Sequence, residues 1–366
     1  MAKLRIKMNL NSFLLNLSLF LFLVLFFYCK PSNSVHAYLE EPYPEKLSDW
    51  KLFIGNISEL KPNDGVLPYD LNMPLFTDYA SKSRFIWMPK GKSAQYKEEG
   101  TFVFPTGTVI SKTFYFEGAK IEDSNFPKQL VETRLLVNSK TGWIALPYIW
   151  NKEMTDARLE IVGSKQTLTY KSADGKKLNL NYIIPNTNQC LACHGDQKQF
   201  QPIGPKAKNL NRLYTYSDGE ENQLLKWKKL GYLTGLTDIP TTPSFPNFES
   251  IKKENLREQA RAYLDVNCAH CHNPEGVANT SGLMLNYEET NKNKIGFCKT
   301  PVASGKGSGN MLYDIYPGKP DQSILLYRMM SNEPDIQMPE IGRSIHHKEG
   351  VELIRQWIQS EKGDCI

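Results

Sequence analysis

Two copies of the pattern Cys-x-x-Cys-His constrain this chain more than any other feature of its sequence. They are Cys190-Leu191-Ala192-Cys193-His194 and Cys268-Ala269-His270-Cys271-His272. Two thiols three positions apart on a helical turn can each add to a vinyl group of haem, and the following histidine is placed to bind the iron. We therefore predict two covalently bound haem c groups. Their predicted ligands are the thiols of Cys190, Cys193, Cys268 and Cys271 and the imidazoles of His194 and His272.

Two other uses of paired cysteines fit this pattern less well. A structural zinc ion takes four ligands, and each motif supplies at most three. A redox dithiol of the thioredoxin type normally follows a strand, whereas the second motif follows a predicted helix. His270, inside the second motif, is expected to be a surface residue.

Each iron can take a further axial ligand opposite its histidine. For the second motif we predict Met338, because this methionine precedes Pro339 and the closing helix, and a thioether opposite histidine suits outer-sphere electron transfer. Its competitors are Met284, Met311, Met329, Met330, His346 and His347. The sequence has no methionine or histidine between His194 and Cys268. The first site therefore takes Met73, Met88, Met154 or another residue type, or it stays open.

The first 37 residues have the pattern of an export leader. Lys3, Arg5 and Lys7 precede an uncharged apolar stretch over residues 13–28, and Val35-His36-Ala37 is a plausible cleavage site. The competing interpretation is a lipoprotein leader that ends before Cys29, which would tether the chain to a membrane. Both interpretations place the folded part in the periplasm, either free or anchored.

Charge argues against nucleic acid as a partner. The formal net charge is +5, but four of the basic residues lie in the leader, which contains no acidic residue. The remainder is close to neutral and has no basic run with interleaved aromatic residues.

The cysteines outside the motifs also form a pattern. Of seven cysteines, four belong to the motifs and one is Cys29, which leaves Cys298 and Cys365. In an oxidising compartment such a pair is more often bridged than free. We therefore predict a disulfide between Cys298 and Cys365, which would attach the C-terminal tail to the loop of the 290s.

The pattern of apolar residues divides the remainder into three parts. Residues 46–200 are rich in β-branched and aromatic residues and predict an antiparallel β domain that ends in the first motif. Residues 201–249 read as a linker or mixed segment, with a short helix over 223–230. Residues 250–366 have a helical period, with one helix leading into Cys268 and an amphipathic helix at the end. The predicted fold class is α+β.

Several runs carry a resemblance to known proteins. They include Pro74-Leu75-Phe76-Thr77-Asp78-Tyr79-Ala80, Phe104-Pro105-Thr106-Gly107-Thr108 and Tyr263-Leu264-Asp265-Val266-Asn267-Cys268. Together they resemble a family of bacterial dihaem c-type cytochromes of unassigned role, often encoded beside a parallel β-helix repeat protein. The segment from Asp321 to Ser360 is similar to the C-terminal half of class I cytochrome c, which implies an axial role for Met338. The β domain with its terminal motif looks like the cytochrome P460 and cytochrome c′-β group, which implies an open first haem.

These observations lead to one expected function and two alternatives. We expect electron transfer with periplasmic or membrane-bound redox proteins, because the sequence has no other catalytic motif. The first alternative is a dihaem redox enzyme, peroxidase-like or binding a small molecule, in which an open first haem receives electrons from the second. The second is a haem-bearing adhesion or scaffold module, which rests on the resemblance alone.

Overall fold

The computed structural model describes residues 33–365, except 118–119, 122–126, 172–176, 196–199, 250–252 and 303. Most of the predicted leader, including Cys29, lies outside the described residues. Across the described residues, no helix combines the length and the apolar character needed to cross a membrane. The chain contains both helices and antiparallel sheets, so the predicted α+β class holds at this level.

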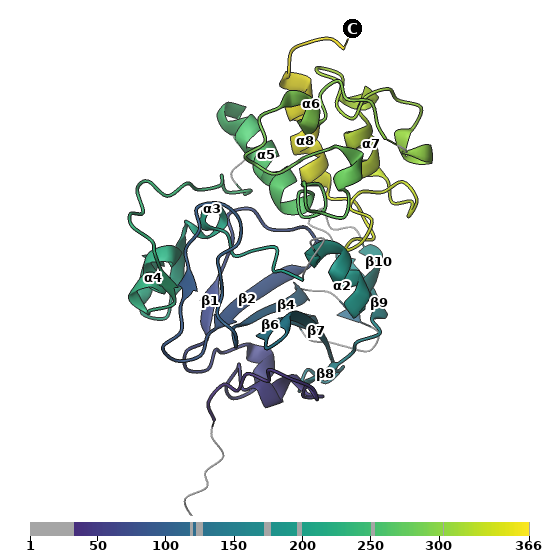
Figure 1. Ribbon diagram of the computed structural model, residues 1–366. Helices are drawn as coiled ribbons and strands as arrows, with labels where there is room; N and C mark the ends of the chain where they lie inside the picture. Colours follow the sequence, from purple (N-terminus) through teal and green to yellow (C-terminus); the bar gives the residue numbers. More distant parts are fainter. Residues whose placement is uncertain are drawn as a thin grey trace, which may run out of the picture. The chain divides into compact units, whose positions relative to one another are not determined.

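A six-stranded antiparallel sheet, with strand order β1-β2-β4-β6-β7-β8, forms the centre of the N-terminal half (Figure 1). Its strands are β1 (Leu67–Tyr69), β2 (Ser81–Trp87), β4 (Val109–Glu117), β6 (Lys128–Ser139), β7 (Gly142–Trp150) and β8 (Ala157–Leu159). Strands β6 and β7 form an antiparallel hairpin that turns at residues 139–142, as expected for the antiparallel β domain predicted over residues 46–200. Because side chains alternate between the two faces of a strand, Phe85 and Leu135 on one face pack into a buried apolar cluster with Trp50 and Tyr148.

A second, three-stranded sheet of β10, β9 and β5 leads into the first motif. Its strands are β5 (Lys120–Ile121), β9 (Ser164–Lys171) and β10 (Lys177–Ile184), and the helix α2 (Thr187–His194) follows. Leu180 and Tyr182 of β10 pack with Phe114 of the central sheet. The first motif is thereby fixed beside the large sheet.

Residues 201–249, which we predicted as a linker or mixed segment with a short helix over 223–230, are folded onto the central sheet. This segment contains α3 (Ala207–Leu210), β11 (Leu213–Tyr216), β12 (Gly219–Asn222), α4 (Gln223–Lys229) and β13 (Leu233–Thr234), and β13 pairs with β3 (Ala94–Gln95). Leu210, Leu224 and Trp227 are fully buried against Ile86 and Ile110 of the sheet. The prolines of this segment suggested a linker, but its apolar residues cover one end of the sheet.

The C-terminal part is helical, as predicted. Its helices are α5 (Leu256–Asn267), α6 (Lys292–Ile295), α7 (Ile324–Met330) and α8 (Lys348–Ser360), which are grouped together in Figure 1. Apolar residues of α5, α7 and α8 share one core that includes Leu264, Leu326 and Trp357. The predicted bridge between Cys298 and Cys365 is present, with the two Cα atoms 5.2 Å apart.

The segment after β1 joins the β-rich and helical parts. Met73 is fully buried in the helical core, and the backbone N–H of Phe76 donates to Asn267 Oδ1 at 2.8 Å. The buried carboxylate of Asp78 accepts hydrogen bonds from the backbone N–H groups of Ser344 and Ile345, at 2.7 and 3.0 Å. The conspicuous run 74–80 therefore holds the two motif-bearing parts against each other.

Candidate functional site

The first motif lies on the helix α2. Pro185 and Asn186 end the preceding strand, and Asn186 and Gln189 form a reciprocal capping box that begins the helix. Cys190 is buried and Cys193 is half-buried, and their spacing places both thiols on one face of the helix. A short helix is thus sufficient to present both thiols in one direction.

His194 ends this helix with one ring nitrogen engaged. Its Nδ1 lies 2.9 Å from the carbonyl oxygen of Gln201, and its ring stacks on Phe200 with the centroids 5.0 Å apart. Burial, and next the charge of Lys112, lower the pKa of His194 to about 3, so the ring is neutral. A neutral imidazole that donates through Nδ1 has its lone pair on Nε2, as an iron ligand requires.

The second motif follows the end of α5. Cys268 caps the helix, and its carbonyl oxygen accepts hydrogen bonds from the backbone N–H groups of Cys271 and His272, at 3.1 and 3.0 Å. The Nδ1 of His272 lies 3.3 Å from Ser281 Oγ. Burial is the main cause that lowers the pKa of His272 to about 4. Both motif histidines are therefore neutral and held through Nδ1.

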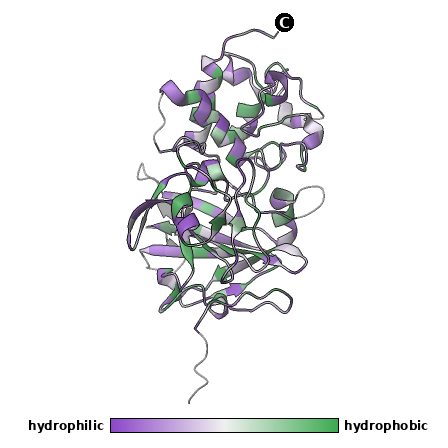
Figure 2. Ribbon diagram, turned by 60° about the vertical axis from the view of Figure 1, so that its left-hand side comes forward, coloured by the Kyte–Doolittle hydropathy of each residue, from purple (hydrophilic) through white to green (hydrophobic). Residues whose placement is uncertain are grey.

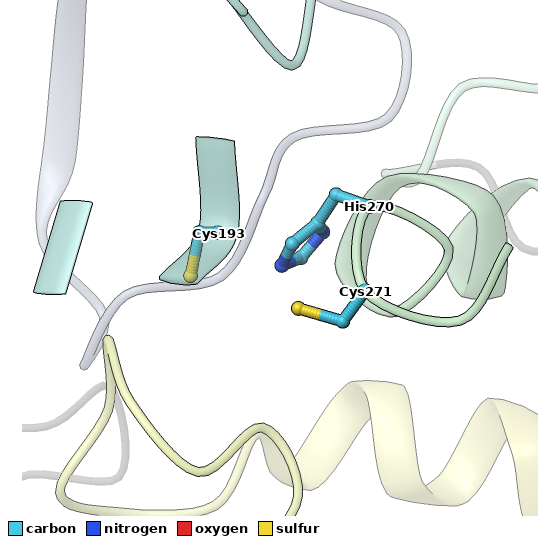
Figure 3. Close-up of side chains that lie close together, drawn as sticks. All are labelled: Cys193, His270 and Cys271. Atoms are coloured by element: carbon cyan, nitrogen blue, oxygen red, sulfur yellow. The ribbon is translucent and has the colours of Figure 1, made fainter. Parts of the chain in front are cut away.

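The two motifs meet in the folded chain. Cys193, His270 and Cys271 bring one ligand atom each to within 4.8 Å of one another, and Figure 3 shows them turned toward a common point. A hydrogen bond between the two sulfurs lowers the pKa of Cys193 and raises that of Cys271. Our expectation that His270 is a surface residue is wrong. It is half-buried, and its Nδ1 is buried without a hydrogen-bond partner among the residues that the structure describes.

A cavity of about 1070 Å³, including space open to solvent, is lined by residues of both motifs, although Cys271 and His272 are not among them. Its lining includes Cys190, Cys193, His194, Cys268 and Met338. Thiols from both motifs and a free imidazole nitrogen thus border one space, and this donor set fits covalently held haem.

Met338 is held in place by its backbone. Its N–H donates to the carbonyl oxygen of Arg328 at 3.0 Å, and its carbonyl oxygen accepts from Arg343 Nη2 at 2.9 Å. Of its competitors, Met329 lines the same cavity but packs in the helical core, and Met330 is 44% exposed. His347 also lines the cavity, although its ring stacks on Phe76 and its Nδ1 contacts the Tyr263 hydroxyl at 3.1 Å. Met338 is half-buried and lines the cavity, whereas Met284, Met311 and His346 are not among its lining residues.

The three upstream methionines do not reach the first motif. Met73, Met88 and Met154 are buried in three different apolar clusters, and none of them is among the described residues that line a cavity beside His194. None of these three methionines is therefore positioned to be the further axial ligand of the first site.

A second cavity, about 850 Å³ including space open to solvent, shares His194, Lys112 and Arg134 with the first. Its lining includes four basic side chains of the central sheet: Lys82, Arg84, Lys112 and Arg134. The sequence reasoning missed this group. The sequence gives little indication of it, because each of three strands contributes only one or two basic residues. That these residues lie opposite one another becomes clear only when the strand register is known.

Comparisons of the chain with protein families, with curated proteins and with solved structures found no match.

Proposed function

We propose that this chain is a dihaem c-type cytochrome that transfers electrons outside the cytoplasm. In this proposal the helical part corresponds to a class I cytochrome c domain and the sheet with α2 to a β-rich haem domain. The proposal follows the resemblance to bacterial dihaem cytochromes. Its main support is that both motif histidines are neutral and engaged through Nδ1, while Cys190, Cys193 and Cys268 line one cavity.

Each group of residues would have a separate role. Cys190 and Cys193, and likewise Cys268 and Cys271, would form the thioether links, and His194 and His272 would bind the iron ions through Nε2. The bound haem groups would supply reversible one-electron chemistry. Gln201 and Ser281 would fix the orientation of the two imidazoles, as partners of metal-bound histidines commonly do. The proximity of Cys193 and Cys271 supports electron exchange within the chain.

The test is the haem content of the full chain purified from a host that matures c-type cytochromes. The mass should exceed that of the polypeptide by two haem groups. Replacing Cys190 and Cys193 with alanine, or Cys268 and Cys271 with alanine, should each remove one group. A matched control replaces Cys298 and Cys365 with serine, which should leave both groups attached. A wild-type chain with the bare polypeptide mass would overturn the proposal.

The position of the upstream methionines favours a second candidate, a redox enzyme whose first iron is open to a small molecule. The polar cavity beside His194 would then be the reactive side of that haem. A high-spin ferric band that shifts with carbon monoxide would support this candidate. Two low-spin haem groups would exclude it and leave electron transfer as the function.

The cluster of Cys193, His270 and Cys271 favours a third candidate, a site for a divalent metal ion such as zinc. Three ligands of these types suit zinc with an open fourth position. A chain that carries one zinc ion and no haem would establish this candidate, and the mass measurement above separates the two.

A further inference from the structure

Basic side chains of three neighbouring strands lie directly opposite one another on the central sheet. The antiparallel register pairs Arg84 of β2 with Lys112 of β4, and Lys112 with Arg134 of β6. Lys82 lies two residues before Arg84 and therefore on the same face. We call Lys82, Arg84, Lys112 and Arg134 the cation row. Like charges directly opposite across a sheet are destabilising, so this arrangement needs a compensating partner.

The protein supplies only part of that compensation. Arg84 pairs with Asp70 at 2.7 Å, and Arg134 pairs with Glu132, with two hydrogen bonds of 2.7 and 2.5 Å. Within the described part of the chain, Lys112 has no hydrogen-bond or ion-pair partner. Its ammonium group lies 5.2 Å from the centroid of the Phe114 ring.

Lys82 is also without a carboxylate partner among the described residues. Its Nζ donates to the carbonyl oxygen of Ala80 at 3.0 Å. Burial, followed by neighbouring basic groups of the row, lowers the pKa of both Lys82 and Lys112. Neither ammonium group has a carboxylate partner among the described residues, and a bound anion would favour the charged form of both lysines.

All four side chains face the cavity of about 850 Å³, and His194 lines the same cavity. The charge is thus directed into a space that can hold a ligand. Arginine and lysine are the side chains that bind carboxylates and inorganic oxyanions best. On the same sheet face Lys112 is flanked by the apolar residues Ile110 and Phe114, and Lys112 and Arg134 also line the first cavity.

We propose that the cation row binds an oxyanion in the cavity beside His194, with Lys112 as the central ligand. Two sources have the same chemistry: a small inorganic oxyanion from solution, or the carboxylate groups of the cofactor held by the first motif. Only the second source rests on the proposed function. A free oxyanion bound here would lie beside the iron ligand of the first motif.

The experiment is a calorimetric titration of the full-length purified protein with sodium sulfate at constant ionic strength. It compares the wild type with Lys112→Gln and with a matched control, Lys177→Gln, whose lysine is exposed on β10. For a free oxyanion, sulfate should bind to the wild type, binding should weaken at least tenfold in Lys112→Gln, and the control should match the wild type. Sulfate binding that is unchanged in Lys112→Gln would overturn the proposal.

The second source is tested on the same proteins by infrared spectroscopy, with the haem carboxylates labelled with carbon-13. If these carboxylates fill the cavity, the wild type should not bind sulfate, and their stretching bands should shift in Lys112→Gln but not in Lys177→Gln. Absence of both sulfate binding and band shifts would overturn the proposal. Haem content is measured separately, and in a chain without haem the sulfate titration alone decides.

Discussion

Glu132 offers the sharpest test of how the cation row is held. This carboxylate is fully buried, accepts two hydrogen bonds from Arg134 at 2.7 and 2.5 Å, and accepts one from the Tyr182 hydroxyl at 2.7 Å. The substitution Glu132→Gln keeps the shape and one acceptor but removes the negative charge. Arg134 would then lie among other cations without its partner.

We expect Glu132→Gln to cause a large loss of stability, although the substitution only replaces one carboxylate oxygen with an amide group. Removing one partner of a buried ion pair costs about 3–5 kcal/mol. Because glutamine keeps one acceptor and Arg134 is partly exposed, we expect a decrease of about 3 kcal/mol in the free energy of unfolding. Because the unfolding entropy scales with the length of the folded unit, Val35–Ile366, this corresponds to a decrease of about 4 °C in the melting temperature, measured by circular dichroism.

The matched control is Glu40→Gln. Glu40 pairs with Lys140 at 2.8 Å, but both side chains are more than half exposed, at 63% and 59%. An exposed pair of this kind contributes about 0–1 kcal/mol. Equal melting temperatures for the two variants would refute the reasoning. So would strict additivity of Glu132→Gln and Arg134→Gln, because directly paired residues should show a coupling of about 0.5–3 kcal/mol.

Three further predictions concern the site and the tail. Met338→Ala should leave both haem groups attached but change the low-spin spectrum and lower the reduction potential of one, whereas Met330→Ala should change neither; an unaltered spectrum in Met338→Ala would rule out this ligand. Burial, and next Arg134 and Arg84, lower the pKa of Lys112 to about 7, and since the unfolded chain keeps this proton up to about pH 10.4, the contribution of Lys112 makes the free energy of unfolding rise between these pH values. Urea titrations across this range should show a smaller rise for Lys112→Met, and identical slopes would contradict the assignment. Replacing both Cys298 and Cys365 with serine opens a loop with a sequence separation of 67 residues and should lower the stability of the helical part by about 4 kcal/mol, and a loss below 1 kcal/mol in urea denaturation would contradict that estimate.

The secondary structure of this chain was largely accessible from its sequence, because local periods determine it. The amphipathic helix α8 and the hairpin of β6 and β7 each have a strong period of apolar residues. For residues 201–249 the sequence left a linker or a mixed segment open, because their burial depends on contacts with a distant sheet. The hydropathy pattern in Figure 2 shows hydrophilic positions on the sheet strands beside hydrophobic ones, but it does not show which of them pair.

The candidate site was predictable only in its parts. The motifs identified four cysteines and two histidines, since their spacing is local. The proximity of Cys193 to Cys271 depends on tertiary contacts such as those of Asp78 with Ser344 and Ile345. The same holds for His270, which the pattern alone places at a variable position and the fold turns toward Cys193.

The cation row shows why register matters for function. On the same sheet face, Ile86, Ile110 and Leu136 form one cross-strand row, and Phe114 begins the apolar cluster on the other side. An apolar residue at position 112 would therefore continue this face without a break and would avoid the electrostatic cost of three adjacent cations. A purely structural requirement gives no reason for a half-buried lysine without a partner at this position. A requirement for a negatively charged ligand explains this lysine, since the ligand would supply the missing negative charge at the point where the strands bring the cations together.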